Sequence, residues 1–162
     1  MEERWSEVTM APVHYRRANE LMLLIAANPA TPEHVLKQLA IEDDPLLLEQ
    51  IAENPSAPLH TLAHLAGHAN ERVRVAVSHN PKTPIEIIYT LIYDVSADVR
   101  YALASNPLLS LEIIQEICQD ENPYVAARAQ QTYGRLTQER TPATNITITL
   151  QNIQYKKFTA AS

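Results

Sequence analysis

Apolar residues recur along the chain at helical spacing, in short segments separated by prolines. In the segment 45–53, Leu47 and Ile51 lie four residues apart, and the segment 58–67 has apolar residues at i, i+3 and i+4 starting from Leu62. This spacing gives each segment one apolar stripe of a helix, with no β-type alternation. The pattern predicts two short helices in succession.

The pair of predicted helices repeats every 26 residues. Two proline columns follow this period, and asparagine precedes proline in the first of them each time. The columns are Asn28-Pro29, Asn54-Pro55, Asn80-Pro81 and Asn106-Pro107, then Pro32, Pro58 and Pro84. Internal repeats of this length indicate a solenoid or array. The sequence predicts an all-α solenoid of about four two-helix repeats with a partial fifth repeat.

Cap residues predict where the helices begin. One column holds strong N-cap residues: Asp44, Asn70, Ser96 and Asn122. Pro45 and Pro123 follow at the first helical position, where a missing N–H costs nothing. For the second helix, Thr83-Pro84 repeats this cap-and-proline arrangement, as does Thr31-Pro32, and Glu86 is placed to complete a capping box with Thr83.

The ends of the chain differ from the repeats. Residues 1–17, which include Trp5, predict an N-terminal arm or cap, residues 18–140 the repeat array and residues 141–162 a C-terminal tail. Within the tail, apolar residues alternate from Ile146 to Leu150, as in a strand. The tail is either disordered or forms a strand that covers the array or pairs with another chain. The second alternative predicts self-association through residues 146–155.

Composition excludes several classes of protein. Two glycines far apart leave no dinucleotide fingerprint, phosphate-binding loop or nucleophile elbow. The net charge of −6, with scattered Lys and Arg, argues against nucleic acid as a partner. No stretch reaches 18 apolar residues, so no membrane span or signal peptide is predicted. The single cysteine suits the cytoplasm, and we expect no cofactor.

Two strings carry a resemblance to a known family. Residues 73–84 read V-R-V-A-V-S-H-N-P-K-T-P and residues 99–107 read V-R-Y-A-L-A-S-N-P. They resemble the leucine-rich repeat variant family, whose repeat is similar to V-R-x-A-V-A-x-N-P-x-T-P, over about residues 18–134. The resemblance implies a right-handed superhelix, related in shape to HEAT arrays, in which α-helices alternate with 3₁₀-helices. It departs at Met22, in the arginine column, and at Ser110, in the second proline column. The family's founding member has a cysteine cluster ahead of its repeats, which this chain lacks, so no iron–sulfur cluster is implied.

Three histidines form the most conspicuous candidate metal site. His60, His64 and His68 lie at i, i+4 and i+8 on one helix, and a pair at i, i+4 can share a zinc ion. Their columns in the other repeats are polar. We therefore favour an ordinary solvated outer face of the second helix, and a metal site is the alternative.

Two tyrosines lie on the same outer face one repeat later. Tyr89 and Tyr93 occupy columns that the other repeats fill mostly with polar or small residues. With His60 and His64 they make an aromatic, hydrogen-bonding patch of the composition favoured at interface hot spots. The alternative is incidental packing over the neighbouring helix.

Arg74 and Arg100 form a stacked column, with Arg72 beside them. These arginines either bind an anion or carboxylate of a partner, or form structural salt bridges to a carboxylate such as Asp98 or Asp120. We favour the salt bridges for the repeated positions. The asparagine column is expected to bond the turns of successive repeats.

No catalytic constellation stands out. Cys118 falls in a column of small apolar residues and is predicted to be buried, and Ser78 occupies a tight helix-packing position. The leading hypothesis is a non-enzymatic protein-interaction module or scaffold that uses one face of the stack. The alternatives are a HEAT-like enzyme or accessory subunit, of the chromophore lyase or DNA-repair type, by fold analogy alone, and a histidine-based metal-responsive module.

Overall fold

Helices alternate between two sets in the computed structural model of the chain, which describes residues 11–140. The first set, the A helices, comprises α1 (Ala11–Ala27), α3 (Pro45–Glu53), α5 (Glu71–His79), α7 (Ala97–Ser105) and α9 (Pro123–Arg140). The second set, the B helices, comprises α2 (Glu33–Leu39), α4 (Leu59–Leu65), α6 (Ile85–Leu91) and α8 (Leu111–Ile117). A 3₁₀ turn, η1 (Ala40–Glu42), follows α2. The described part of the chain is all-helical, as predicted.

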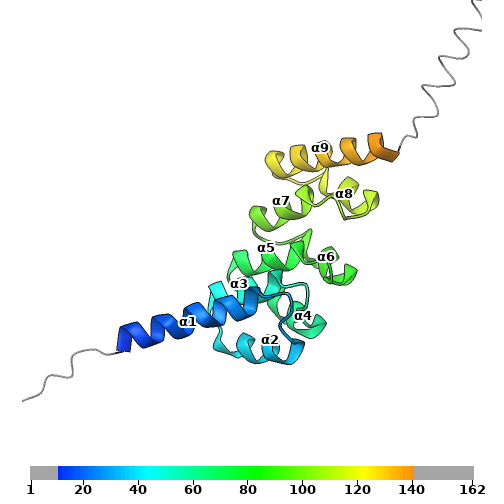
Figure 1. Cartoon of the computed structure of the whole chain (residues 1–162). Coiled ribbons are helices and arrows are strands. Elements are labelled where there is room, and N and C mark those ends of the chain that lie inside the picture. The colour runs from blue at the N-terminus through cyan, green and yellow to red at the C-terminus, as the bar shows by residue number, and fades with distance from the viewer. Residues whose placement is uncertain (1–10, 141–162) are drawn as a thin grey trace, which may run out of the picture.

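The two sets of helices form the two sides of a ladder. Each A helix packs on the A helix of the next repeat, from α1 to α9, and each of α4, α6 and α8 packs between consecutive A helices. Figure 1 shows the A helices stacked on one side and the B helices along the other, with α1 and α9 at opposite ends of the stack. This arrangement confirms the predicted solenoid of two-helix repeats.

The core is the space between the two sets of helices. The predicted apolar columns are buried at nearly every repeat, and their fully inaccessible members include Ile51, Val77, Leu103, Leu36, Leu62 and Ile114. Full burial of such a side chain stabilises the fold by about 1.5–3 kcal/mol. Each repeat contributes the same few residues, so the core is continuous along the stack.

The predicted N-caps of the A helices are confirmed. Oδ1 of Asp44 accepts from the N–H groups of Leu46 and Leu47 at 2.9 and 3.1 Å. Asn70, Ser96 and Asn122 each accept from the N–H two residues further on. The A helices of the middle repeats end before the Asn-Pro dipeptide, since a residue before proline is excluded from the helical region.

The predicted caps of the B helices are wrong. Pro84, at φ −57° and ψ 145°, is itself the extended residue before α6, with no side-chain cap. Thr83 therefore lies one residue too early for a capping box with Glu86. Its hydroxyl donates instead to the carbonyl of Val77, at 2.6 Å, and ties the B helix to the end of the preceding A helix. The threonine at position 31 makes the same bond to Ile25, at 2.5 Å.

The sequence also leads us to expect 3₁₀-helices within the repeats and separate segments at the two ends of the chain. Within residues 11–140, the 3₁₀ geometry is confined to η1, and the B helices are α-helical. Helix α1 runs continuously across the expected boundary between residues 17 and 18. Trp5 and the segment 146–155, with its predicted strand and self-association, lie outside the described residues. No helix of the described part has the length and apolar character needed to cross a membrane.

Candidate interaction surface

Arg74 is held in a closed network between two repeats. Its Nε and Nη2 each donate to Asp94 at 2.7 Å, and its Nη1 donates to the carbonyls of His68 and Ala69 at 2.8 and 3.1 Å. The side chains of Arg74 and Asp94 are only 10% and 7% exposed. The guanidinium is therefore occupied by the chain itself.

Arg100 repeats this arrangement one repeat later. Its Nε donates to Asp120 at 2.7 Å and its Nη2 at 3.1 Å, while its Nη1 donates to the carbonyl of Asp94 at 2.7 Å. We call these two pairs, Arg74–Asp94 and Arg100–Asp120, the arginine clamp. The structural salt bridge is confirmed at Asp120, but the expected pairing with Asp98 is wrong, because the turn after α6 brings Asp94 to the arginine and leaves Asp98 exposed.

The arginine clamp keeps its carboxyl groups ionised. Burial alone would raise the pKa of Asp94, but hydrogen bonds from Arg74 and from the Ser96 N–H, with the attraction of two guanidinium groups, bring that pKa below its usual value. The pKa of Asp120 is lowered by the same balance. The hydrogen bond to Asp94 in turn raises the pKa of Arg74.

The second repeat replaces both members of the clamp. Leu48, which is buried, stands in the arginine column, and His68 stands in the aspartate column. Nδ1 of His68 accepts from the Asn70 N–H at 3.0 Å, as Asp94 accepts from Ser96, and its Nε2 lies 3.5 Å from Oδ1 of Asp43. In the second repeat both columns therefore differ from the third and fourth, whereas the first repeat has Met22 with Glu42.

This position separates His68 from the other two histidines. His60 and His64 are exposed, as predicted, but the His68 side chain is only 15% exposed and bonds within the turn. The solvated face predicted for all three is therefore wrong for His68. Among the described residues, no group of three or more His, Cys, Asp or Glu is placed to hold a metal ion.

The asparagine column bonds successive repeats, as predicted. Nδ2 of Asn80 donates to the carbonyls of Ala52 and Asn54 at 2.6 and 2.9 Å, and its Oδ1 accepts from the Lys82 N–H. Asn54 makes the same bonds one repeat earlier, and Asn106 donates to the carbonyl of Ser78. We call Asn54, Asn80 and Asn106 the asparagine ladder.

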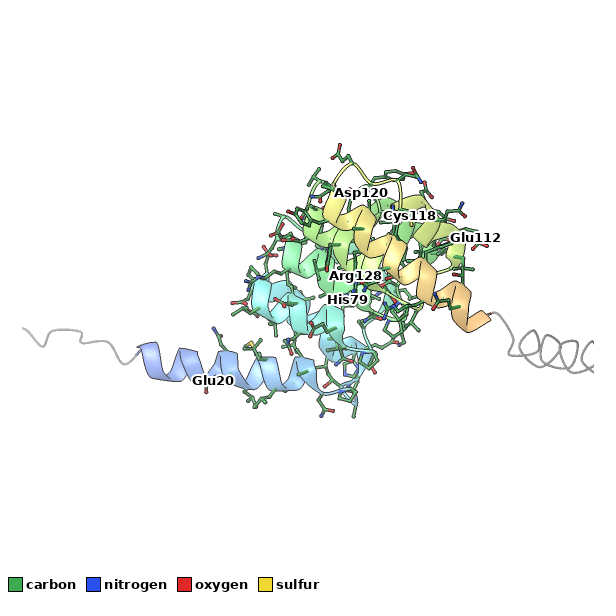
Figure 2. The ribbon with its side chains drawn as sticks, turned by 90° about the horizontal axis from the view of Figure 1, so that it is seen from above. Glu20, His79, Glu112, Cys118, Asp120 and Arg128 are labelled. Atoms are coloured by element: carbon green, nitrogen blue, oxygen red, sulfur yellow. The ribbon has the colours of Figure 1, made fainter. Side chains whose placement is uncertain are left out.

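The two candidate nucleophiles are part of the framework. Ser78 is 1% exposed and its hydroxyl donates to the carbonyl of Val75. Cys118 is half-buried rather than buried, and burial raises the pKa of its thiol, which lowers its thiolate content. Figure 2 places Cys118 beside the turn that follows α8.

Tyr89, His60 and His64 lie on the B helices, and Tyr93 lies in the turn that follows α6. Tyr89 is 47% exposed and Tyr93 is 71% exposed, so neither side chain is buried in the hydrophobic core. His60 and His64 lie on α4, on the same side of the ladder (Figure 1). We call these four residues the B-face patch. None of them pairs with another of the four in the described structure.

Tyr93 also borders a cleft of about 440 Å³. Its hydroxyl donates to the carboxylate of Glu116 on α8, and this hydrogen bond raises the pKa of Tyr93. The other lining residues are Ile92, Asp94, Arg100, Ile117, Gln119, Asp120 and Glu121. Glu116 and Glu121 were not predicted from the sequence, although they lie 23 and 28 residues after Tyr93, on either side of one repeat period.

Arg72 lies on the other side of the ladder. It is exposed, and it borders a groove of about 630 Å³ across the A helices, where Leu24 of α1 and Leu46 of α3 are exposed. The structure therefore divides the predicted partner-binding residues into three places: the B-face patch, the arginine clamp and this groove.

The architecture is that of an all-helical repeat protein. A scan against protein-family models, a search of curated proteins and a search of solved structures each gave no match. The resemblance to the leucine-rich repeat variant family stays a prediction.

Proposed function

We propose that the protein is a non-enzymatic interaction module that binds a protein partner through the B-face patch. The observation that carries this proposal is the exposure of Tyr89 and Tyr93 on the side of the ladder formed by the B helices, where Ile85 is also exposed. Tyrosine offers a large contact area and a hydroxyl at little cost in side-chain entropy, which is why it is enriched at interface hot spots.

The buried candidate residues are already hydrogen-bonded within the chain, which favours the B-face patch as the binding surface. Arg74 and Arg100 donate to their own aspartates and to turn carbonyls, so neither guanidinium is presented to a partner. Ser78 is tied to its own helix. The patch groups four exposed side chains on one side of the ladder, whereas Arg72 is the single exposed member of the predicted site on the other side. We extend the proposal to a cytoplasmic module of the leucine-rich repeat variant type, whose partner is not nucleic acid.

Quantitative capture of partners tests the proposal. The full chain is immobilised, and proteins recovered from native lysate are quantified against the double variant Tyr89→Ala/Tyr93→Ala. Loss of two hot-spot residues reduces recovery of a true partner by about tenfold or more. The matched control is Tyr101→Ala/Tyr124→Ala, which removes two exposed tyrosines of the A helices. Equal recovery by both double variants contradicts the proposal.

A further inference from the structure

The cleft beside Tyr93 has the chemistry of a site for a basic side chain. Four carboxylates line it, and Arg100 is the one cation among its lining residues. Asp94 and Asp120 are committed to the arginine clamp. Glu121 lies 3.7 Å from Nη2 of Arg100, but its side chain is 91% exposed and open to a second cation. Glu116, also exposed, is held by the Tyr93 hydroxyl.

The walls of the cleft suit the apolar stem of a lysine as well as its charge. Ile92 and Ile117 are buried, at 4% and 3% exposure, and form its apolar lining. Tyr93 is open to solvent and offers a ring face to a cation. A lysine can bury its methylene groups against such surfaces and present its ammonium to Glu116 and Glu121.

The chain itself supplies a segment of complementary charge. All 19 acidic residues lie within the first 140 positions, whereas residues 141–162 contain no Asp or Glu and two adjacent lysines, Lys156 and Lys157. Aromatic residues flank this pair at Tyr155 and Phe158. The segment 155–158 therefore has positive charge and ring faces where the cleft has negative charge and apolar walls.

The tail is long enough to reach the cleft of its own molecule. Helix α9 begins beside the turn that carries Asp120 and runs away from it, as Figure 2 shows. An 18-residue helix is about 27 Å long. The 15 residues from 141 to 155 span up to about 50 Å when extended, so they can return along α9.

We propose that the segment 155–158 docks in this cleft within the same chain, with Lys156 or Lys157 between Glu116 and Glu121. This inference deepens the proposed function, because a tail docked beside Tyr93 covers one end of the B-face patch. A protein partner that uses Tyr93 then has to displace the tail. The cleft is thus occupied by the basic segment of the same chain. The alternative occupant is the same segment of a second copy.

Zero-length carbodiimide cross-linking of the purified full chain tests this docking, because it joins a lysine only to a carboxylate in direct contact. We expect a link between Lys156 or Lys157 and Glu116 or Glu121 in the monomeric product, identified by peptide mass spectrometry. Raising the salt to about 1 M screens the attraction and reduces the yield several-fold. Tyr93→Ala reduces it about threefold, whereas Tyr89→Ala, outside the cleft, leaves it unchanged.

Two results overturn the proposal. One is the absence of this link, or a yield no greater than that to Glu20 and Glu49, which line the groove beside Arg72. The other is its presence only in cross-linked dimers, which assigns the segment to a second copy. Since no partner is present in this experiment, its outcome is independent of the capture experiment. The docking can fail while the B-face patch still binds a partner, and the reverse also holds.

A second measurement avoids the cross-linking chemistry. In Lys156→Gln/Lys157→Gln, the backbone amide shifts of Gln119 to Glu121 should move relative to the wild type, because the docked charge is gone. The control Lys37→Gln/Lys82→Gln changes the chain's other two lysines and leaves those shifts in place. Unchanged shifts in the tail variant contradict the docking.

Discussion

Arg74 and Asp94 form a two-bond ion pair of 2.7 Å contacts, and one repeat earlier the same two positions hold Leu48 and His68. The pair is 20 residues apart in sequence, and it closes the turn between α6 and α7 over the preceding turn. The same two positions of the repeat are therefore filled in two ways. The third and fourth repeats have an arginine–aspartate ion pair, and the second has a leucine and a histidine.

Removal of one member of the clamp should be costly. In Arg74→Leu, Asp94 loses two charged donors at a site where both side chains are nearly buried, and we expect a loss of about 3 kcal/mol in the free energy of unfolding. The double variant Arg74→Leu/Asp94→His reproduces the pair of the second repeat and should unfold within about 1 kcal/mol of the wild type. Urea denaturation followed by circular dichroism measures both values. A double variant no more stable than Arg74→Leu would show that the two residue pairs are not interchangeable.

The asparagine ladder should contribute unequally along the stack. Asn80→Ala leaves two carbonyls of the preceding repeat, those of Ala52 and Asn54, without their side-chain donor, and we expect it to cost about 2–4 kcal/mol. Asn28, in the first repeat, is exposed, and its Oδ1 accepts from the Ala30 N–H, so Asn28→Ala should cost about 0.5 kcal/mol. Thermal unfolding of the two variants side by side measures the difference. Similar losses in both would exclude an inter-repeat role for Asn80.

Stability should fall in acid. Because the pKa values of Asp94 and Asp120 are lowered in the folded chain, their contribution is fully present above the unfolded value of about 3.9 and is lost as the pH falls through the folded values. We expect the urea midpoint to drop between about pH 5 and pH 2. The neutral double variant Arg74→Leu/Asp94→Asn removes one of the two pairs and should lose less over this range. A parallel fall in both proteins would assign the acid sensitivity to other groups.

Restoring the missing proline of the fourth repeat should stabilise the array. Ser110, at φ −66° and ψ 154°, already has the conformation of Pro58 and Pro84, and its cap bond to the Ile113 N–H is long, at 3.5 Å. Ser110→Pro should raise the free energy of unfolding by about 0.5 kcal/mol by restricting the unfolded chain.

The control for this substitution is Ser96→Pro. The Ser96 N–H donates to Asp94 and its hydroxyl caps α7, so proline there should cost about 2 kcal/mol. If Ser110→Pro also lowers the free energy of unfolding, the hydrogen bond from the Ile113 N–H to the Ser110 hydroxyl contributes more stability than its 3.5 Å distance indicates.

The repeat itself explains which parts of the structure were predictable. Helix α3 begins and ends at the predicted residues, Pro45 and Glu53, because a cap and a proline act locally at each end. The bonds of the asparagine ladder were predicted because a buried turn needs donors and each repeat offers the same amide. Features fixed within one turn of backbone, or repeated at every period, were accessible from the sequence.

Contacts across the turns were less accessible. The partner of Arg74 depends on how the turn after α6 folds back, and the spacing of charges alone did not distinguish Asp94 from Asp98. The repeat did contain a signal, because His68 replaces aspartate in the repeat where Leu48 replaces arginine. The cleft beside Tyr93 depends on the separation of α6 and α8, which no column of residues specifies.

The short range of the hydrogen bonds in the asparagine ladder also determines the order in which the repeats unfold. Each of its bonds joins residues no more than 28 positions apart, and none extends past the neighbouring repeat. The array therefore behaves as a short one-dimensional polymer, whose terminal units have one neighbour and whose central units have two. Hydrogen exchange should accordingly proceed inward from α1 and α9, with α5 the last to open. A second copy of residues 81–106 inserted after Asn80 would offer the same asparagine and arginine–aspartate bonds on either side, and would lengthen the molecule without creating a new kind of contact.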